Sequence, residues 1–161
     1  SGAEIGASWH VGQYNKSRLE DLDVHAARDV KILVLDAAAG RGPYGVEGEY
    51  ALATIDLPAS LAGSIFAGAQ DGYYRQGSRS FLEGAVSDLP HSYFETVVRF
   101  DRVDFDRDLK GDDVRKWTLG VNFRPTSESV FKLDYFKSWS HDRFNVLARG
   151  AGILFSVATY F

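Results

Sequence analysis

Alternation of apolar and polar residues with a period of two is the feature that most constrains this chain, and it is clearest in residues 94–101. Successive side chains of a β-strand point to opposite faces, so such a pattern predicts a strand with one apolar and one charged face. The apolar side carries Phe94, Thr96, Val98 and Phe100, and the other side carries Glu95, Arg99 and Asp101. The segment therefore predicts a strand whose two faces lie in different surroundings.

The same alternation recurs along the rest of the chain. The predicted strands are residues 3–11, 30–39, 44–53, 72–82, 94–101, 117–124, 131–135 and 153–161. The pattern is weakest in 72–82, where Arg75 and Arg79 share one face and the opposite face is not clearly apolar. About eight strands result, and an even number is usual for single-chain bacterial membrane barrels.

The connectors between these strands alternate in length. Residues 40–43 and 124–128 are short, whereas 14–27, 56–71 and 104–115 are longer and mostly polar, and only 83–92 breaks the order. Short turns at one rim and long loops at the other are the layout of an outer-membrane barrel, with the short turns on the periplasmic side. The segment 57–69 is compatible with a short helix folded over or into the barrel.

Composition narrows the class of protein. With 161 residues the chain predicts one domain, residues 1–161, and no run of about 18 apolar residues predicts a transmembrane helix. The first six residues lack the pattern of a signal peptide, which suggests a mature chain or one cut from a longer protein. The net charge is -4, and the acidic and basic residues are scattered along the chain, so they form no basic stripe that could bind nucleic acid. Cysteine is absent, which excludes disulfides and thiol chemistry.

Alternating strands also occur in soluble sandwiches and barrels, so the choice depends on which face is buried. Aromatic residues near strand ends favour a membrane, because transmembrane barrels carry aromatic girdles at both interfaces. These residues are Trp9, Tyr44, Trp117, Tyr135, Trp139 and Phe161. Opposite charges recur on the polar faces, and the chain ends on an aromatic residue within a strand. We therefore expect an all-β, transmembrane, antiparallel up-and-down β-barrel in the bacterial outer membrane.

The last ten residues, 152–161, resemble the terminal strand of bacterial outer-membrane proteins. The residues that carry this assembly signal are Gly152, Phe155, Val157 and Phe161. Together with residues 98–104, 117–126 and 130–135, they resemble the C-terminal region of the phosphate-selective porin family and its porin-like relatives. The resemblance implies recognition by the barrel assembly machinery, contact with outer-membrane lipid and lipopolysaccharide, and often a homotrimer. Such porins have about sixteen strands, so this chain would be the second half, and no phosphate-binding residue is carried over.

The charged faces of the strands supply the candidate pore-lining residues. They are Glu47, Glu49, Arg75, Arg79, Glu95, Arg99, Asp101, Arg124, Lys132 and Asp134. A ring of charge at a constriction selects ions, but the same residues could simply pair with one another and line the barrel. Their signs nearly balance, which favours the second interpretation.

Catalytic and metal chemistry find little support in the sequence. The acidic loop 104–113 has Leu109 and Arg115 where a calcium-binding EF-hand loop needs Gly and Glu. His141 lies near Ser138 and Ser140 in sequence, yet no spacing makes them a nucleophile and its base. His10, His25 and His91 are scattered, and the turn 40–43 precedes no helix that could bind phosphate. We expect no catalytic residue, metal or cofactor.

Three functions follow, in decreasing order of support. The first is a passive outer-membrane channel for small hydrophilic or ionic solutes. The second is a complete eight-stranded barrel with a structural or adhesive role and no open pore, because side chains fill so narrow a barrel. The third is a lipid-modifying barrel enzyme, which would need a Ser-His-acid cluster at the outer rim.

Overall fold

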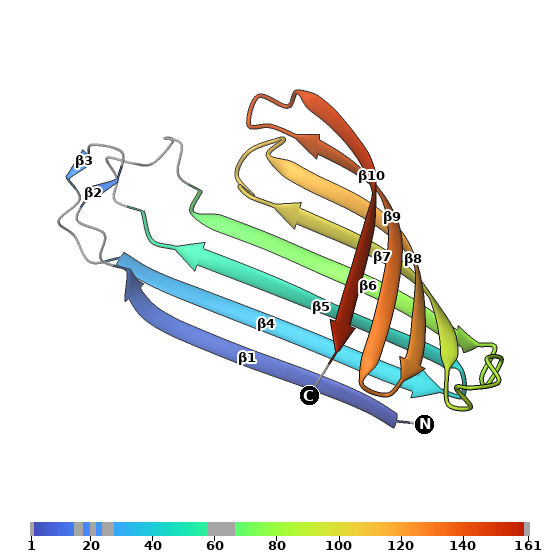
Figure 1. Ribbon diagram of the computed structural model, residues 1–161. Coiled ribbons are helices and arrows are strands. Elements are labelled where there is room, and N and C mark those ends of the chain that lie inside the picture. Colours follow the sequence, from blue (N-terminus) through green and yellow to red (C-terminus); the bar gives the residue numbers. More distant parts are fainter. Residues whose placement is uncertain (1, 15–17, 20–21, 24–27, 58–66, 160–161) are drawn as a thin grey trace.

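The chain is all-β in the computed structural model, which describes residues 2–14, 18–19, 22–23, 28–57 and 67–159 (Figure 1). The strands are β1 (Gly2–Tyr14), β2 (Arg18–Leu19), β3 (Leu22–Asp23), β4 (Arg28–Arg41), β5 (Tyr44–Ile55), β6 (Ala69–Phe81), β7 (Tyr93–Asp104), β8 (Asp113–Thr126), β9 (Ser129–His141) and β10 (Leu147–Thr159). No helix capable of crossing a membrane is found in the described residues. The helix expected in 57–69 lies almost wholly outside them.

Eight of the strands form one antiparallel up-and-down sheet. Their order is β1-β4-β5-β6-β7-β8-β9-β10, so each strand pairs with its neighbours in the sequence, apart from the small β2–β3 hairpin. Six of the predicted segments fall wholly within these strands, which confirms the eight predicted strands in outline. The prediction 72–82 extends one residue beyond β6, and 153–161 extends beyond β10 into residues outside the described part. The strands run for 12 to 14 residues, longer than the alternation alone indicated.

The connectors divide the sheet into two ends, as the sequence predicted. The turn end carries the two-residue connections 42–43 and 127–128, together with the longer segment 82–92. The loop end carries the remaining connections, which are 15–27, 56–68, 105–112 and 142–146. Gly42 occupies the left-handed region at φ 57°, which explains why the first tight turn uses glycine.

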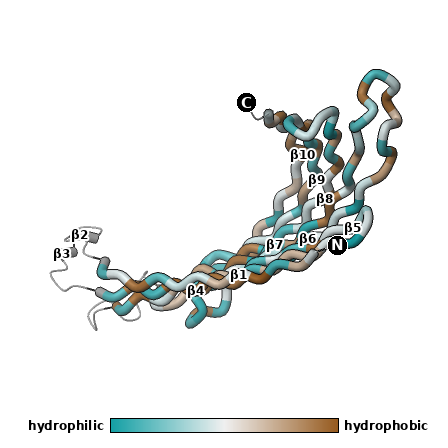
Figure 2. Tube along the Cα trace, turned by 90° about the horizontal axis from the view of Figure 1, so that it is seen from below, coloured by the Kyte–Doolittle hydropathy of each residue, from teal (hydrophilic) through white to brown (hydrophobic). Residues whose placement is uncertain are grey.

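The sheet is strongly curved and open. Strands β1 and β10 form its two edges, and each pairs with one neighbour among the described strands. The view of Figure 2 separates β10 from β1, at opposite ends of the curled sheet. β1 and β10 run in opposite directions, because seven antiparallel pairings separate them.

The sheet has two chemically distinct faces, which the strand register defines. We call the face that carries Phe100 and Trp117 the outer face, and the face that carries Asp101 and Lys116 the inner face. Cross-strand partners share a face, so the assignment extends to all eight strands. Large apolar side chains of the outer face are widely exposed, as listed here: Ile5, Val46, Trp117, Leu119, Leu133, Tyr135, Ile153 and Phe155.

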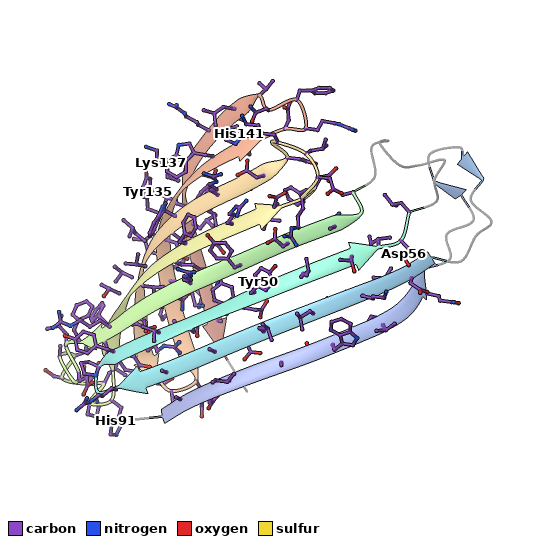
Figure 3. All side chains as sticks on the ribbon, turned by 180° about the vertical axis from the view of Figure 1, so that it is seen from behind. Tyr50, Asp56, His91, Tyr135, Lys137 and His141 are labelled. Carbon is purple, nitrogen blue, oxygen red and sulfur yellow. The ribbon has the colours of Figure 1, made fainter. Side chains whose placement is uncertain are left out.

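The inner face is the more enclosed one where the sheet curls. In β8 and β9, polar inner residues are buried or half-buried while their apolar neighbours are exposed. Asn122 is 7% exposed, whereas the adjacent Val121 is 43% exposed. Figure 3 shows Tyr135 and Lys137 pointing away from the space around which the sheet curls. Among the described residues Val130 is the one buried hydrophobic side chain, so the other apolar side chains of the described sheet are partly or fully exposed.

Candidate lumen-facing surface

The inner face collects charged side chains from six of the eight strands, β6 and β10 being the exceptions among the described residues. They are Glu4, Asp36, Glu47, Glu49, Glu95, Arg99, Asp101, Lys116, Arg124, Lys132 and Asp134. The register places many of them in continuous rows. One such row runs Gly6, Asp36, Glu49, Tyr74, Asp101, Lys116, Ser138 and Gly150. Eight of the ten predicted pore-lining residues lie on this face.

The centre of the inner face is an ion-pair cluster around Asp101. Its carboxylate accepts a hydrogen bond from Arg99 Nε at 2.8 Å, and Lys116 Nζ lies 3.7 Å from its other oxygen. The Arg99 guanidinium also stacks over the Tyr74 ring, 3.8 Å from the ring centroid. Strands β6, β7 and β8 each supply part of this cluster, so it fixes their inner side chains against one another.

A second cluster lies closer to the turn end. The Asn122 side-chain amide donates to Glu95 Oε2 at 3.0 Å, and Arg124 Nε approaches the same oxygen at 4.0 Å. Lys132 is the cross-strand partner of Asn122 on the other side. The two inner-face carboxylates of β7, Glu95 and Asp101, therefore have cationic or amide partners on β8.

The other side of the inner face is an acidic wall, formed by Glu4, Asp36, Glu47 and Glu49 of β1, β4 and β5. Asp36 and Glu49 are direct cross-strand partners, an arrangement in which like charges repel. Within the described part of the chain, no Lys or Arg lies within ion-pair distance of these four carboxylates. Negative charge is thus concentrated on one wall and neutralised on the other.

Arg75 and Arg79 correct the sequence-based assignment, because both lie on the outer face. Arg75 pairs with Gly48 and Phe100, and Arg79 pairs with Tyr44 and Thr96. Their guanidinium groups rest over aromatic rings, Arg75 over Tyr73 at 5.4 Å and Arg79 over Tyr44 at 5.6 Å. The sequence grouped them with the acidic residues because β6 has no clearly apolar face.

Three inner-face charges were missed by the sequence analysis: Glu4, Asp36 and Lys116. Glu4 alternates with Ile5, so the pattern already held a weak signal for it. Asp36 precedes three alanines that blur the alternation, and Lys116 lies one residue before the predicted strand. With these changes the described side chains of the inner face include seven carboxylates and four cations, a net charge of -3, whereas the ten predicted residues sum to zero.

Several inner glycines accommodate the side chain of the residue opposite. The Phe136 ring covers Gly152, where an added Cβ would lie 2.8 Å from a ring carbon. Asp134 similarly occupies the space above Gly120, and Asp36 that above Gly6. Aromatic cover of a glycine is a known device for fixing strand register.

The predicted assembly signal is divided between the two faces. Phe155 and Val157 are exposed on the outer face of β10, at 67% and 53%, while Gly152 lies on the inner face. Phe161 lies outside the described residues. Recognition by an assembly factor remains a prediction.

The Ser-His arrangement considered for an enzyme is not assembled. Ser138 and Ser140 lie on the inner face of β9, and His141 lies on the outer face. His141 Nδ1 instead contacts Asp113 Oδ1 at 2.8 Å, at the loop end. In the acidic loop, Asp104 and Asp106 accept hydrogen bonds from backbone N–H groups two residues on. The described residues hold no cluster of three metal-ligating side chains.

Comparisons of the chain with protein-family models, curated proteins and solved structures found no match.

Proposed function

We propose that the chain forms part of a transmembrane β-barrel of the bacterial outer membrane, through which small hydrophilic or ionic solutes diffuse. The observation that carries the proposal is the inverted distribution of polarity: exposed aromatic and aliphatic side chains on the outer face, enclosed charges on the inner face. Water is a poor solvent for such an outer face, whereas lipid requires it. The division into turn end and loop end supports the same topology.

The open edges support a wide barrel over a narrow one. In hydrocarbon, every backbone N–H and C=O group needs a partner, so β1 and β10 must each pair with another strand. These eight strands leave the sheet open, as expected if they line part of a larger circumference (Figure 2). The chain resembles porins of about sixteen strands, and this resemblance also favours a wide barrel. Further strands from another segment or a second copy would complete the barrel.

The net charge of -3 on the inner face favours cations as permeating ions. The acidic wall has no cationic partner in the described residues, whereas Asp101 and Glu95 do. Carboxylates that face a narrow aqueous path raise the local concentration of cations.

A second candidate function is a closed eight-stranded barrel without a pore. It is favoured by the opposite directions of β1 and β10, which allow these strands to pair antiparallel. Eight strands would leave an interior that side chains such as Tyr74, Arg99 and Phe136 fill.

Liposome swelling separates the two candidates. The full chain, refolded and reconstituted in liposomes, is placed in an iso-osmotic solution of a small sugar. A wide barrel admits the sugar, and the liposomes swell at a rate that falls with the size of the sugar. A filled barrel inserts, as judged by heat-modifiable migration, without any swelling above empty liposomes.

A further inference from the structure

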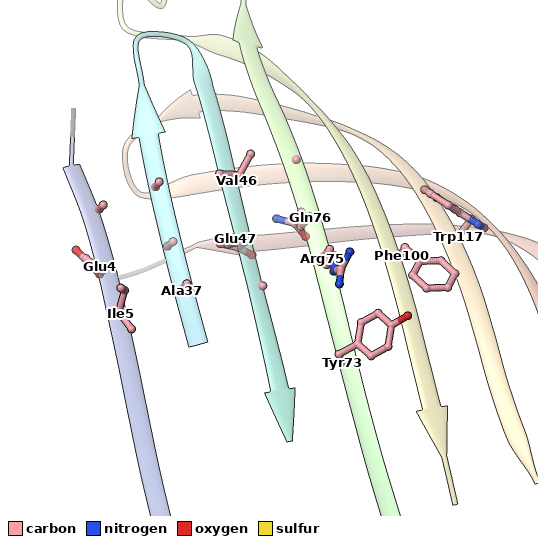
Figure 4. A pocket seen from close by; sticks show the side chains of 15 residues that line it. Glu4, Ile5, Ala37, Val46, Glu47, Tyr73, Arg75, Gln76, Phe100 and Trp117 are labelled. Atoms are coloured by element: carbon pink, nitrogen blue, oxygen red, sulfur yellow. The ribbon is translucent and has the colours of Figure 1, made fainter. Parts of the chain in front are cut away.

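The outer face contains a groove over β1, β4, β5 and β6. Two adjoining hollows of about 840 and 600 Å³ form it, and both are lined by Ile5, Ala37, Gly48, Tyr73 and Arg75. The floor is made of alanine and glycine, so the backbone lies close to the surface. Figure 4 shows Tyr73, Phe100 and Trp117, from three successive strands, beside Arg75. The groove is therefore a mostly apolar trough in which Arg75 is the one cation among the described lining residues. Glu4, Asp36, Glu47 and Glu49 also belong to the lining, but the register directs their side chains to the inner face.

Arg75 is, like Arg79 and Lys137, an outer-face cation that rests over an aromatic ring. It is exposed, and its direct cross-strand neighbours are Gly48 and Phe100. No carboxylate of the described residues lies within ion-pair distance of its guanidinium, which rests over the Tyr73 ring. A cationic side chain on a face that lipid covers needs either an anionic partner or a position from which its charged group reaches the membrane–water interface.

The aromatic residues of the outer face indicate where that interface lies. At the turn end, Phe81, Phe94, Phe123 and Phe131 form a ladder of rings with centroids 4.7 to 6.3 Å apart. Tyr73, Phe100 and Trp117 form a second row nearer the loop end. On β6, Phe81 and Tyr73 are eight residues apart, about 26 Å at roughly 3.3 Å per residue. At the strand tilt of about 35–45° that is usual in membrane barrels, this distance corresponds to about 20 Å along the membrane normal, comparable with the apolar band of about 25 Å that such barrels carry.

Arg75 lies inside this band and extends toward its loop-end border, where Tyr73 lies. Arginine binds phosphate oxygens through two parallel hydrogen bonds, and it pairs well with aromatic faces. An amphiphile with an anionic head and an acyl chain therefore matches both parts of the groove. Its phosphate would meet Arg75, and its chain would cover the alanine and glycine floor.

We propose that the groove binds an anionic, phosphate-bearing membrane lipid, with Arg75 as the residue that recognises its phosphate. The proposal rests on the membrane location proposed above. Trp117 lines the same groove and serves as its reporter.

The test uses lipids with brominated acyl chains, which quench the fluorescence of a tryptophan that they touch. Trp9→Phe and Trp139→Phe leave Trp117 as the single tryptophan of the full chain. This protein is reconstituted in vesicles that contain brominated phosphatidylglycerol or brominated phosphatidylcholine. We expect phosphatidylglycerol to be favoured about fivefold, the typical contribution of one interfacial arginine.

Arg75→Gln should abolish the preference, and Arg75→Lys should keep most of it. Arg79→Gln is the matched control, since Arg79 lies on the same strand and face but outside both hollows, and it should keep the preference. Equal quenching by the two lipids, or a preference that survives Arg75→Gln, would overturn the proposal. So would displacement of phosphatidylglycerol by millimolar inorganic phosphate, or protection of Trp117 from both lipids by a second copy. If neither lipid quenches a version that keeps all three tryptophans, the membrane location itself fails.

Discussion

At the scale of single residues, the face assignment predicts which charges control ion permeation. Glu47 and Glu49 lie on the acidic wall of the inner face, whereas Arg75 lies on the outer face. Replacing both glutamates by glutamine changes the inner net charge from -3 to -1. We expect the reversal potential in a potassium chloride gradient to move toward zero, because less cation is attracted to the lumen.

Arg75→Gln is the control for this experiment, and it should leave the reversal potential unchanged. The substitution Arg75→Gln removes one unit charge, as each Glu→Gln substitution does, but the side chain at position 75 faces away from the lumen. A larger effect of Arg75→Gln than of the double glutamine variant would mean that the two faces have been assigned the wrong way round.

Glycine positions give a second prediction at this scale. An added Cβ at Gly48 would lie 2.9 Å from the backbone oxygen of Tyr74, whereas at Gly77 it would meet nothing within 4 Å. Gly48→Ala should lower the free energy of unfolding by about 1–3 kcal/mol, since the backbone must shift. Gly77→Ala, on the same face of the next strand, should be neutral or stabilising by up to about 1 kcal/mol. Urea titration in vesicles measures both, and equal effects would contradict the strand pairing of β5 with β6.

At the scale of the strands, the polarity of the two faces can be tested with one substitution in two places. Leu119 and Leu154 have similar exposure, 53% and 58%, but lie on opposite faces. Leu119→Lys should destabilise the protein in vesicles by about 2–4 kcal/mol, because it places a cation against lipid. Leu154→Lys should cost less than about 1 kcal/mol, since the new cation faces Asp134 across the strands. Similar losses of unfolding free energy at both sites would show that the two faces lie in the same surroundings, and this would contradict the assignment of one face to lipid.

The strands also show how far the sequence could predict this fold. Strong alternation in β7, β8 and β9 gave the strand type and the faces directly, and loop lengths gave the two ends of the sheet. β6 was harder, because Tyr74, Gln76 and Ser78 on one face are about as polar as Arg75, Gly77 and Arg79 on the other. Its faces follow only from Phe100 and the other partners across the strand. Likewise, the face on which Asp36 lies could not be predicted, because Ala37, Ala38 and Ala39 of β4 show no preference for either face.

At the scale of the whole molecule, β1 and β10, whose outer edges have no partner among the described strands, determine what the sheet becomes. Local alternation specifies that a strand forms and which way its side chains point, but it carries no information on the partner of an edge strand. The same eight strands are compatible with a closed narrow barrel or with part of a wide one. The inner face therefore could be predicted in outline, whereas the width of the lumen could not.

Edge pairing can be tested directly, because the native chain has no cysteine. Single cysteines are placed at Ser8 on β1 and at Ala148 on β10, both on the inner face, and a flexible bifunctional cross-linker joins them. In a wide barrel made with a second copy, we expect cross-linked dimers and few cross-linked monomers. Cross-linked monomers alone, in folded protein, would indicate the closed eight-stranded barrel.

Single-channel recording in a planar bilayer tests the central claim, that this chain helps to enclose a water-filled lumen. The full chain is refolded in detergent and added to one side of the bilayer. The account predicts steady conductance steps and, in a salt gradient, a reversal potential on the cation-selective side of zero. A folded, heat-modifiable protein that inserts into the bilayer and carries no current would contradict it.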